Sequence, residues 1–314
     1  MPTCVRSAIE APIRATPMPE PKIYATATDF RRALEDRLNQ TAKNQSPDLA
    51  RLRKMVAFER LLARLFCDER PPWLLKGGYA MEMRFRENAR ATKDIDLALP
   101  EAHIAPGGDK ITSDQLLTKL GRAAAIDLKD WFNFQVGDFS AALDAQPYGG
   151  FRFPVESKVD DRVFTNFHFD VALGDPADQE PEWITGHDLL AFAGIPAVKI
   201  AVISKEQHFA EKIHAYTRPR AGAINSRTRD LLDLALLIRK GELKAGRAVA
   251  AIQATFKRRK THAIPADLNF PPNQWEKPYQ RMAEETGFPI TQMPEAFQLI
   301  VDYWKSIQPL IAKE

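Results

Sequence analysis

The segment from Asp94 to Leu99, with the sequence Asp-Ile-Asp-Leu-Ala-Leu, most tightly constrains what this chain can fold into. Successive side chains of a strand point to opposite faces, so Asp94 and Asp96 share one face and the apolar residues share the other. The apolar face needs a core, and the pattern therefore predicts a strand that is buried on one side. Two carboxylates about 7 Å apart on the open face can hold one or two hard cations. The alternative is a strand whose acids are only solvated.

A double glycine, Gly77-Gly78, follows the apolar segment 73–75 and the cation Lys76, and it precedes a helical pattern. Glycine lets the backbone approach a ligand closely, and a helix N-terminus presents free N–H groups to an anion. A phosphate cradle beside paired aspartates is suited to transferring a nucleotide, because metal ions can bridge its triphosphate. Either motif alone is common in turns and loops, and the specificity lies in their combination and order.

A third carboxylate lies in the predicted strand 163–171, where polar and apolar residues alternate. His168 and Asp170 fall on its polar face. If this strand neighbours the one that carries Asp94 and Asp96, Asp170 completes a three-acid metal site. His168 is expected to be a neighbour of that site, because hard cations prefer oxygen ligands.

Two predicted helices downstream carry further charged candidates. The helix at 205–216 has Lys212 beside its apolar stripe, and the helix at 227–238 has Asp230 and Asp233 on one face. Taken alone, Asp230 is a first-turn acid favoured by the helix dipole, and Lys212 is a surface lysine.

The composition is that of a soluble globular protein. The chain has 314 residues, a net charge of +3 and two cysteines, so we expect two domains and a reducing, cytoplasmic location. It has no apolar segment long enough to span a membrane and no signal-peptide pattern. Basic residues at 51–64 and at 257–260 are expected to be solvated faces, with RNA contact as the alternative.

Periodicity predicts an α+β fold, with an α/β domain that holds a short mixed sheet and flanking helices and is followed by a mainly helical domain. The predicted boundaries are a mobile tail at 1–22, the α/β domain at 23–203 and the helical domain at 204–314. Strands at 151–155 and 163–171 are expected to pair, joined by a polar segment at 156–162. The candidate site is expected in the cleft between the two domains.

Four segments in this order resemble the AbiEii-type nucleotidyltransferase toxin family, the toxin half of AbiE-like toxin–antitoxin systems within the DNA polymerase β-like superfamily. The resemblance covers about residues 50–240, and the segments are 76–84, 90–97, 209–215 and 229–234.

This resemblance implies roles for the candidate residues. Lys76, Gly77 and Gly78 match the triphosphate loop, and Asp94 and Asp96 match the metal-binding carboxylates. The third and fourth motifs give the remaining matches: Lys212 is expected to contact the nucleotide phosphates, and Asp230 is expected to orient that lysine or accept a proton from the acceptor hydroxyl. Arg90 either reaches a phosphate or only balances the acids, and Asp170 as the third metal ligand is inferred from its strand position.

The resemblance also implies an enzyme that uses NTP with Mg²⁺ or Mn²⁺, modifies the 3′ end of tRNA, blocks translation and is restrained by an antitoxin. Three alternatives remain open. The acceptor is a protein or a small molecule such as an aminoglycoside; the chain is a non-catalytic binding module with the same fold; or Lys212 and Asp230 form an ordinary interhelical ion pair.

Overall fold

The structure of this chain is a computed structural model, which describes residues 21–44, 48–100, 111–143, 149–174, 179–219 and 227–311. The predicted tail at 1–22 lies outside this range except for its last two residues. The helices of the described part are α1 (Ala27–Asn44), α2 (Leu49–Leu65), α3 (Gly77–Phe85), α4 (Ser113–Ala124), α5 (Lys205–Thr217), α6 (Thr228–Lys240), α7 (Ala245–Arg259), α8 (Glu276–Glu285) and α9 (Met293–Ile311).

The strands of the described part form one mixed sheet. They are β1 (Leu74–Lys76), β2 (Asp94–Leu99), β3 (Phe132–Val136), β4 (Ala141–Ala142), β5 (Gly150–Val159), β6 (Arg162–Leu173), β7 (Glu182–Thr185) and β8 (Lys199–Val202). Their order is β3-β5-β6-β2-β1-β8-β7, and β4 pairs with β5. The pairs β2–β6 and β1–β8 are parallel, and the other pairs are antiparallel. The predicted mixed sheet is confirmed, and β6 lies beside β2, which places Asp170 next to Asp96.

The polar connection predicted at 156–162 is wrong in extent. Strand β5 continues to Val159 and β6 begins at Arg162, so only Asp160 and Asp161 form the turn. Both have positive φ, 56° and 53°, which is the conformation that a tight two-residue hairpin requires and that aspartate tolerates better than most residues. Glu156 and Lys158 are half-buried on one face of β5, whereas Ser157 is buried on the other.

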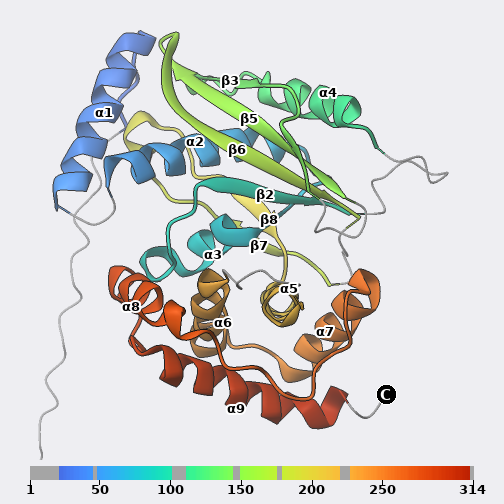
Figure 1. Ribbon diagram of the computed structural model, residues 1–314. Helices are drawn as coiled ribbons and strands as arrows, with labels where there is room; N and C mark the ends of the chain where they lie inside the picture. Colours follow the sequence, from blue (N-terminus) through green and yellow to red (C-terminus); the bar gives the residue numbers. More distant parts are fainter. Residues whose placement is uncertain are drawn as a thin grey trace, which may run out of the picture.

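Two hydrophobic clusters form the core. One joins the sheet to α1, α2 and α4, and the other lies among α5 to α9, which Figure 1 shows gathered on one side of the sheet. Met81 of α3 and Ala89 belong to the second cluster, so α3 connects the two parts. We propose a domain boundary at residue 203, which these two clusters support. No helix in the described ranges has the length and apolarity needed to cross a membrane.

The expectation of a solvated basic face at 51–64 is wrong for most of its cations. Arg60 and Arg64 are buried and both bind Asp130, whose side chain is 1% exposed. The other arginines of α2 pair as well: Arg51 binds Glu82 and Arg53 binds Glu35, each at 2.7 Å. The arginines of α2 therefore connect it to the rest of the fold and do not form a solvated basic face.

Candidate active site

The candidate carboxylates meet because of strand register. Strand β1 aligns Lys76 with Asp96, β6 aligns Asp170 with Asp96, and β5 aligns Arg152 with Asp170. Asp94 lies two residues before Asp96 on the same face of β2. Partial burial, followed by the charges of Asp170 and Asp94, raises the pKa of Asp96 to about 6. The three acids thus repel one another and favour a cation between them.

Arg152 is the cation that contacts Asp170. Its guanidinium donates two hydrogen bonds to the Asp170 carboxylate, both at 2.7 Å, and it lies 3.8 Å from an oxygen of Asp94. Hydrogen bonding to Asp170 raises the pKa of Arg152. In the described residues no three His, Cys, Asp or Glu side chains form a cluster ready to hold a metal ion. Both oxygens of Asp170 are thus engaged by Arg152, and its role as a third metal ligand stays a prediction.

The double glycine lies against Asp96. Gly77 has a φ of +65°, and a Cβ built on it would lie 2.0 Å from Oδ2 of Asp96. A Cβ on Gly78 would lie 2.8 Å from the Thr92 hydroxyl oxygen. Helix α3 starts here without a side-chain cap, which leaves its first N–H groups available to a ligand. Only glycine allows the turn and the acid to come this close.

Lys212 of α5 lies between two acids of α6. Its Nζ donates to Asp230 at 3.1 Å and to Asp233 at 2.6 Å, and Arg90 also binds Asp233, at 2.9 Å. Burial favours the neutral forms, but the opposite charges prevail: they raise the pKa of Lys212 and lower that of Asp233. Lys212 is therefore held as a fixed cation.

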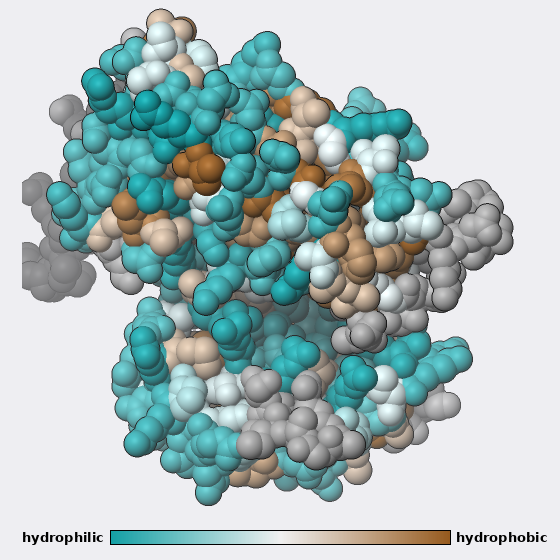
Figure 2. Space-filling model, turned by 45° about the horizontal axis from the view of Figure 1, so that its top comes forward, coloured by the Kyte–Doolittle hydropathy of each residue, from teal (hydrophilic) through white to brown (hydrophobic). Residues whose placement is uncertain are grey.

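These groups surround one cavity of about 230 Å³, which we call the glycine crevice. Figure 2 shows a hollow with largely hydrophilic walls between the two parts of the molecule. His208 lines the crevice, and its buried Nε2 has no hydrogen-bond partner in the described structure. The crevice is lined by Gly77, Gly78, Arg90, Asp96, His208, Glu211, Lys212, His214, Ala215, Arg218, Arg227, Asp230 and Arg259.

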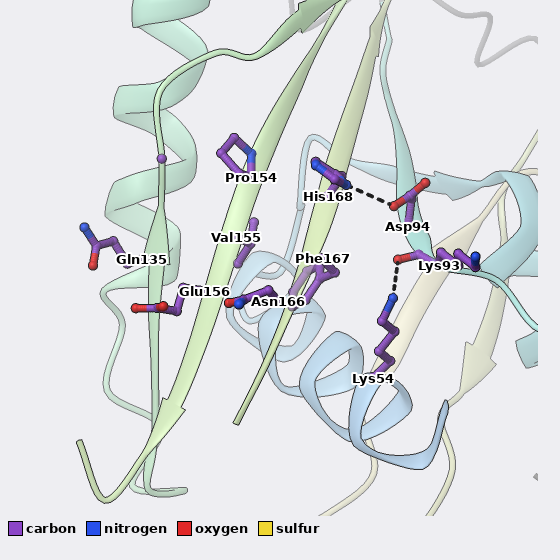
Figure 3. Close-up of a pocket in the computed structure, with 11 residues that line it drawn as sticks. Lys54, Lys93, Asp94, Gln135, Pro154, Val155, Glu156, Asn166, Phe167 and His168 are labelled. Atoms are coloured by element: carbon purple, nitrogen blue, oxygen red, sulfur yellow. Dashed lines mark hydrogen bonds and ion pairs between the residues drawn. The ribbon is translucent and has the colours of Figure 1, made fainter. Parts of the chain in front are cut away.

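Three predicted residues lie outside the crevice lining. Lys76 binds Glu211 at 2.9 Å, which connects β1 to α5. Asp170 is engaged by Arg152, as described above. Asp94 faces a second, open cavity of about 670 Å³ on the sheet, which we call the sheet groove (Figure 3).

The residues present fit a divalent cation and a polyphosphate. Asp94 and Asp96 offer hard oxygen ligands, and burial together with the neighbouring acids disfavours the charge of Asp96, which a bound cation would compensate. Across the crevice lie Arg90, Lys212 and the N-terminus of α3, which together favour an anion. The orphaned Nε2 of His208 offers a further polar contact for a ligand.

Asp233 and Arg152 are site residues that the candidate set omitted. Asp233 was visible as an acid on the same helix face as Asp230, but spacing alone does not show which of two acids a lysine approaches. Arg152 lies on the same strand face as Pro154 and Glu156, and only the register of β5 against β6 brings it to Asp170.

The close approach at Gly77 predicts the effect of a single methyl group. Gly77→Ala and Gly287→Ala, where φ is +61°, should each lose about 1–2 kcal/mol of stability, because both place an L side chain in the left-handed region. A Cβ added at Gly287 would meet open space, whereas one added at Gly77 must displace Asp96. Gly77→Ala alone should therefore lose activity, by about 10²-fold. Denaturant titration and initial transfer rates measure both effects, and equal activity in the two variants would contradict this packing.

The family model described as "Nucleotidyl transferase AbiEii toxin, Type IV TA system" matches residues 60–302. No curated protein matches the sequence.

Two solved structures are similar to this one to different degrees. MenT4, a nucleotidyltransferase toxin from Mycobacterium tuberculosis H37Rv, aligns with a TM-score of 0.52 and 14% identity over 88% of this chain and 98% of that chain. The shared fold confirms the predicted α+β class. The antibiotic-resistance factor ANT(2″)-Ia aligns with a TM-score of 0.34 and 17% identity over 66% of this chain and 93% of that one, too distantly to support an argument.

Proposed function

Because this chain belongs to the AbiEii nucleotidyltransferase toxin family, we propose that it transfers nucleotides from an NTP to the 3′ end of tRNA and so blocks translation. That the chain is a nucleotidyltransferase follows from the family and agrees with the fold. The observation that carries the finer proposal is the convergence of Gly77, Asp96 and Lys212 on one crevice, from three separate parts of the sequence.

We assign the nucleotide phosphates to the glycine crevice. A Mg²⁺ or Mn²⁺ ion held by Asp94 and Asp96 would supply neutralisation of the triphosphate and activation of the attacking oxygen. The N–H groups of α3 at Gly77 and Gly78 would hold a phosphate, and Lys212 would stabilise the charge that develops on the leaving pyrophosphate.

Asp230 fits a positioning role better than that of a proton acceptor. One of its oxygens accepts from Lys212 at 3.1 Å, and the other lies 3.4 Å from Arg227. Both oxygens are thus engaged by cations of neighbouring side chains. Asp230 and Asp233 together would fix the direction of the Lys212 ammonium group.

The partners and the location are part of the same proposal. The acceptor is tRNA, the restraining partner is a cognate antitoxin protein, and the cytoplasm is where NTP and tRNA are both present. A protein or a small molecule remains the competing acceptor. Purified enzyme incubated with α-labelled NTPs, total RNA and total protein separates these: we expect label on tRNA only, and label confined to protein would overturn the tRNA assignment.

Arg152 gives a prediction about metal binding that does not depend on activity. Arg152→Gln should raise the affinity for Mn²⁺ at least about tenfold, because it frees both Asp170 oxygens to serve as a third ligand. Arg162→Gln, an exposed arginine on the neighbouring strand, is the control. Titration calorimetry measures the affinity, and an unchanged value in Arg152→Gln would show that Asp170 takes no part in metal binding.

A further inference from the structure

We propose that the sheet groove is the acceptor site and holds the unpaired 3′ end of an RNA strand. This inference rests on the function proposed above and places its second substrate. Nucleotide transfer needs two substrates that reach the same carboxylates. The glycine crevice contains Asp96 and the phosphate-binding groups, and the groove has Asp94 on its wall. Each cavity therefore contains one acid of the carboxylate pair, and the crevice is the one suited to the triphosphate.

The register of the strands arranges the residues of the groove in rows across the sheet, and Asp94 lies at the end of the first row. Pro154, His168 and Asp94 form one row across β5, β6 and β2, and Nδ1 of His168 lies 3.5 Å from a carboxylate oxygen of Asp94. The next row carries three polar side chains on neighbouring strands, as Figure 3 shows: Gln135, Glu156 and Asn166.

The groove is open to solvent, while the residues between its rows belong to the core. Gln135, Asn166 and His168 are exposed, whereas Val155 and Phe167 are 2% and 4% exposed. The end of an RNA strand can thus lie across the polar rows and reach Asp94. The cavity of about 670 Å³ is of the size that small ligands occupy, which suits a chain end and not a duplex.

The chemistry of the groove matches an RNA end. Amide side chains can read the edges of unpaired bases, and the imidazole of His168 and the ring of Pro154 offer flat surfaces for packing. Lys54 borders the groove, and in the described part of the chain its ammonium has one polar neighbour, the Lys93 carbonyl oxygen at 3.5 Å. It is therefore available for a phosphate.

A polycationic small molecule is the less suitable occupant. Such a ligand needs uncompensated carboxylates, but Glu156 pairs with Lys158 at 3.0 Å. Asp94 is also required at the reacting centre. Among the described residues the Lys54 ammonium has no carboxylate partner, and its charge favours an anionic strand over a polycation.

Binding of an RNA hairpin with a single-stranded 3′ tail tests the assignment, measured by fluorescence anisotropy over a salt series. Lys54→Ala should weaken binding about fivefold and reduce the slope of log affinity against log salt by about 0.7, the value for one phosphate contact on a single strand. Asn166→Trp should fill the groove and raise the KM for the RNA about tenfold or more. Both should leave the affinity for a non-hydrolysable NTP with Mn²⁺ unchanged.

The control is Lys119→Ala, which removes an exposed lysine of α4 and should change neither affinity. Wild-type RNA affinity and salt slope in Lys54→Ala, with wild-type KM in Asn166→Trp, would overturn the groove assignment even if the enzyme modifies RNA. Competition for the groove by an aminoglycoside but not by RNA would overturn the choice of occupant. Wild-type protein that modifies no RNA would instead refute the proposed function.

Discussion

Replacement of Asp96 by Asn is expected to lower the rate of nucleotide transfer at least about 10³-fold, or about 4 kcal/mol, without lowering the Tm. The carboxylate is the proposed metal ligand that faces the glycine crevice. In the folded protein, burial and the neighbouring acids disfavour its charge, as the raised pKa shows. A neutral side chain of the same shape therefore relieves repulsion while it removes the ligand.

Asp138→Asn, at an exposed acid outside the site, is the matched control and should behave like wild type in both respects. Transfer rates under saturating NTP and thermal melts without ligand are the two readouts. If Asp96→Asn keeps its activity, Asp96 is not a metal ligand. If activity and Tm fall together, its role is structural.

Asp130→Ala is expected to destabilise the fold by about 3–5 kcal/mol, because it leaves the buried Arg60 and Arg64 without their shared carboxylate. The acid receives three charge-assisted hydrogen bonds from these arginines, at 2.7, 2.9 and 2.7 Å. For a domain of this size, the loss corresponds to a fall in Tm of about 6–20 °C. Activity per folded molecule at low temperature should not change, since Asp130 lies outside the crevice lining.

Glu35→Ala is the control, because the Arg53–Glu35 pair is partly exposed and should contribute less than about 1 kcal/mol.

Asp130 also makes the stability of the fold depend on pH. Burial opposes the charge of Asp130, but Arg64 and Arg60 lower its pKa below the unfolded value. Its stabilisation is thus complete above the unfolded pKa of about 3.9 and disappears as pH falls through the folded value. A denaturation profile for Asp130→Ala that parallels wild type at acid pH would contradict this.

Local patterns in the sequence were enough to locate the elements of the site. Alternation predicted the faces of β2 and β6, and helical spacing placed Asp230 and Asp233 on one side of α6. The expected cleft between the sheet and the later helices agrees with the observed crevice, since its lining comes from both. The strand and helix faces could be predicted because they depend on neighbours within one element.

Pairing between distant elements could not be predicted in the same way. The burial of Arg60 and Arg64 depends on Asp130, and the engagement of Asp170 depends on Arg152 of another strand. Helical periodicity assigns an arginine to a face of its helix but does not identify the residue packed against that face. The register of β5 against β6 places Arg152 on Asp170, and no single strand's sequence determines that register.

A structure with a non-hydrolysable NTP and Mg²⁺ tests the central claim most directly, namely that phosphate, metal and carboxylates meet at the glycine crevice. We predict the triphosphate against Gly77 and Gly78, with a phosphate oxygen near Lys212 and the ion on Asp94 and Asp96. A nucleotide bound elsewhere on the protein, with this crevice empty, would contradict the account.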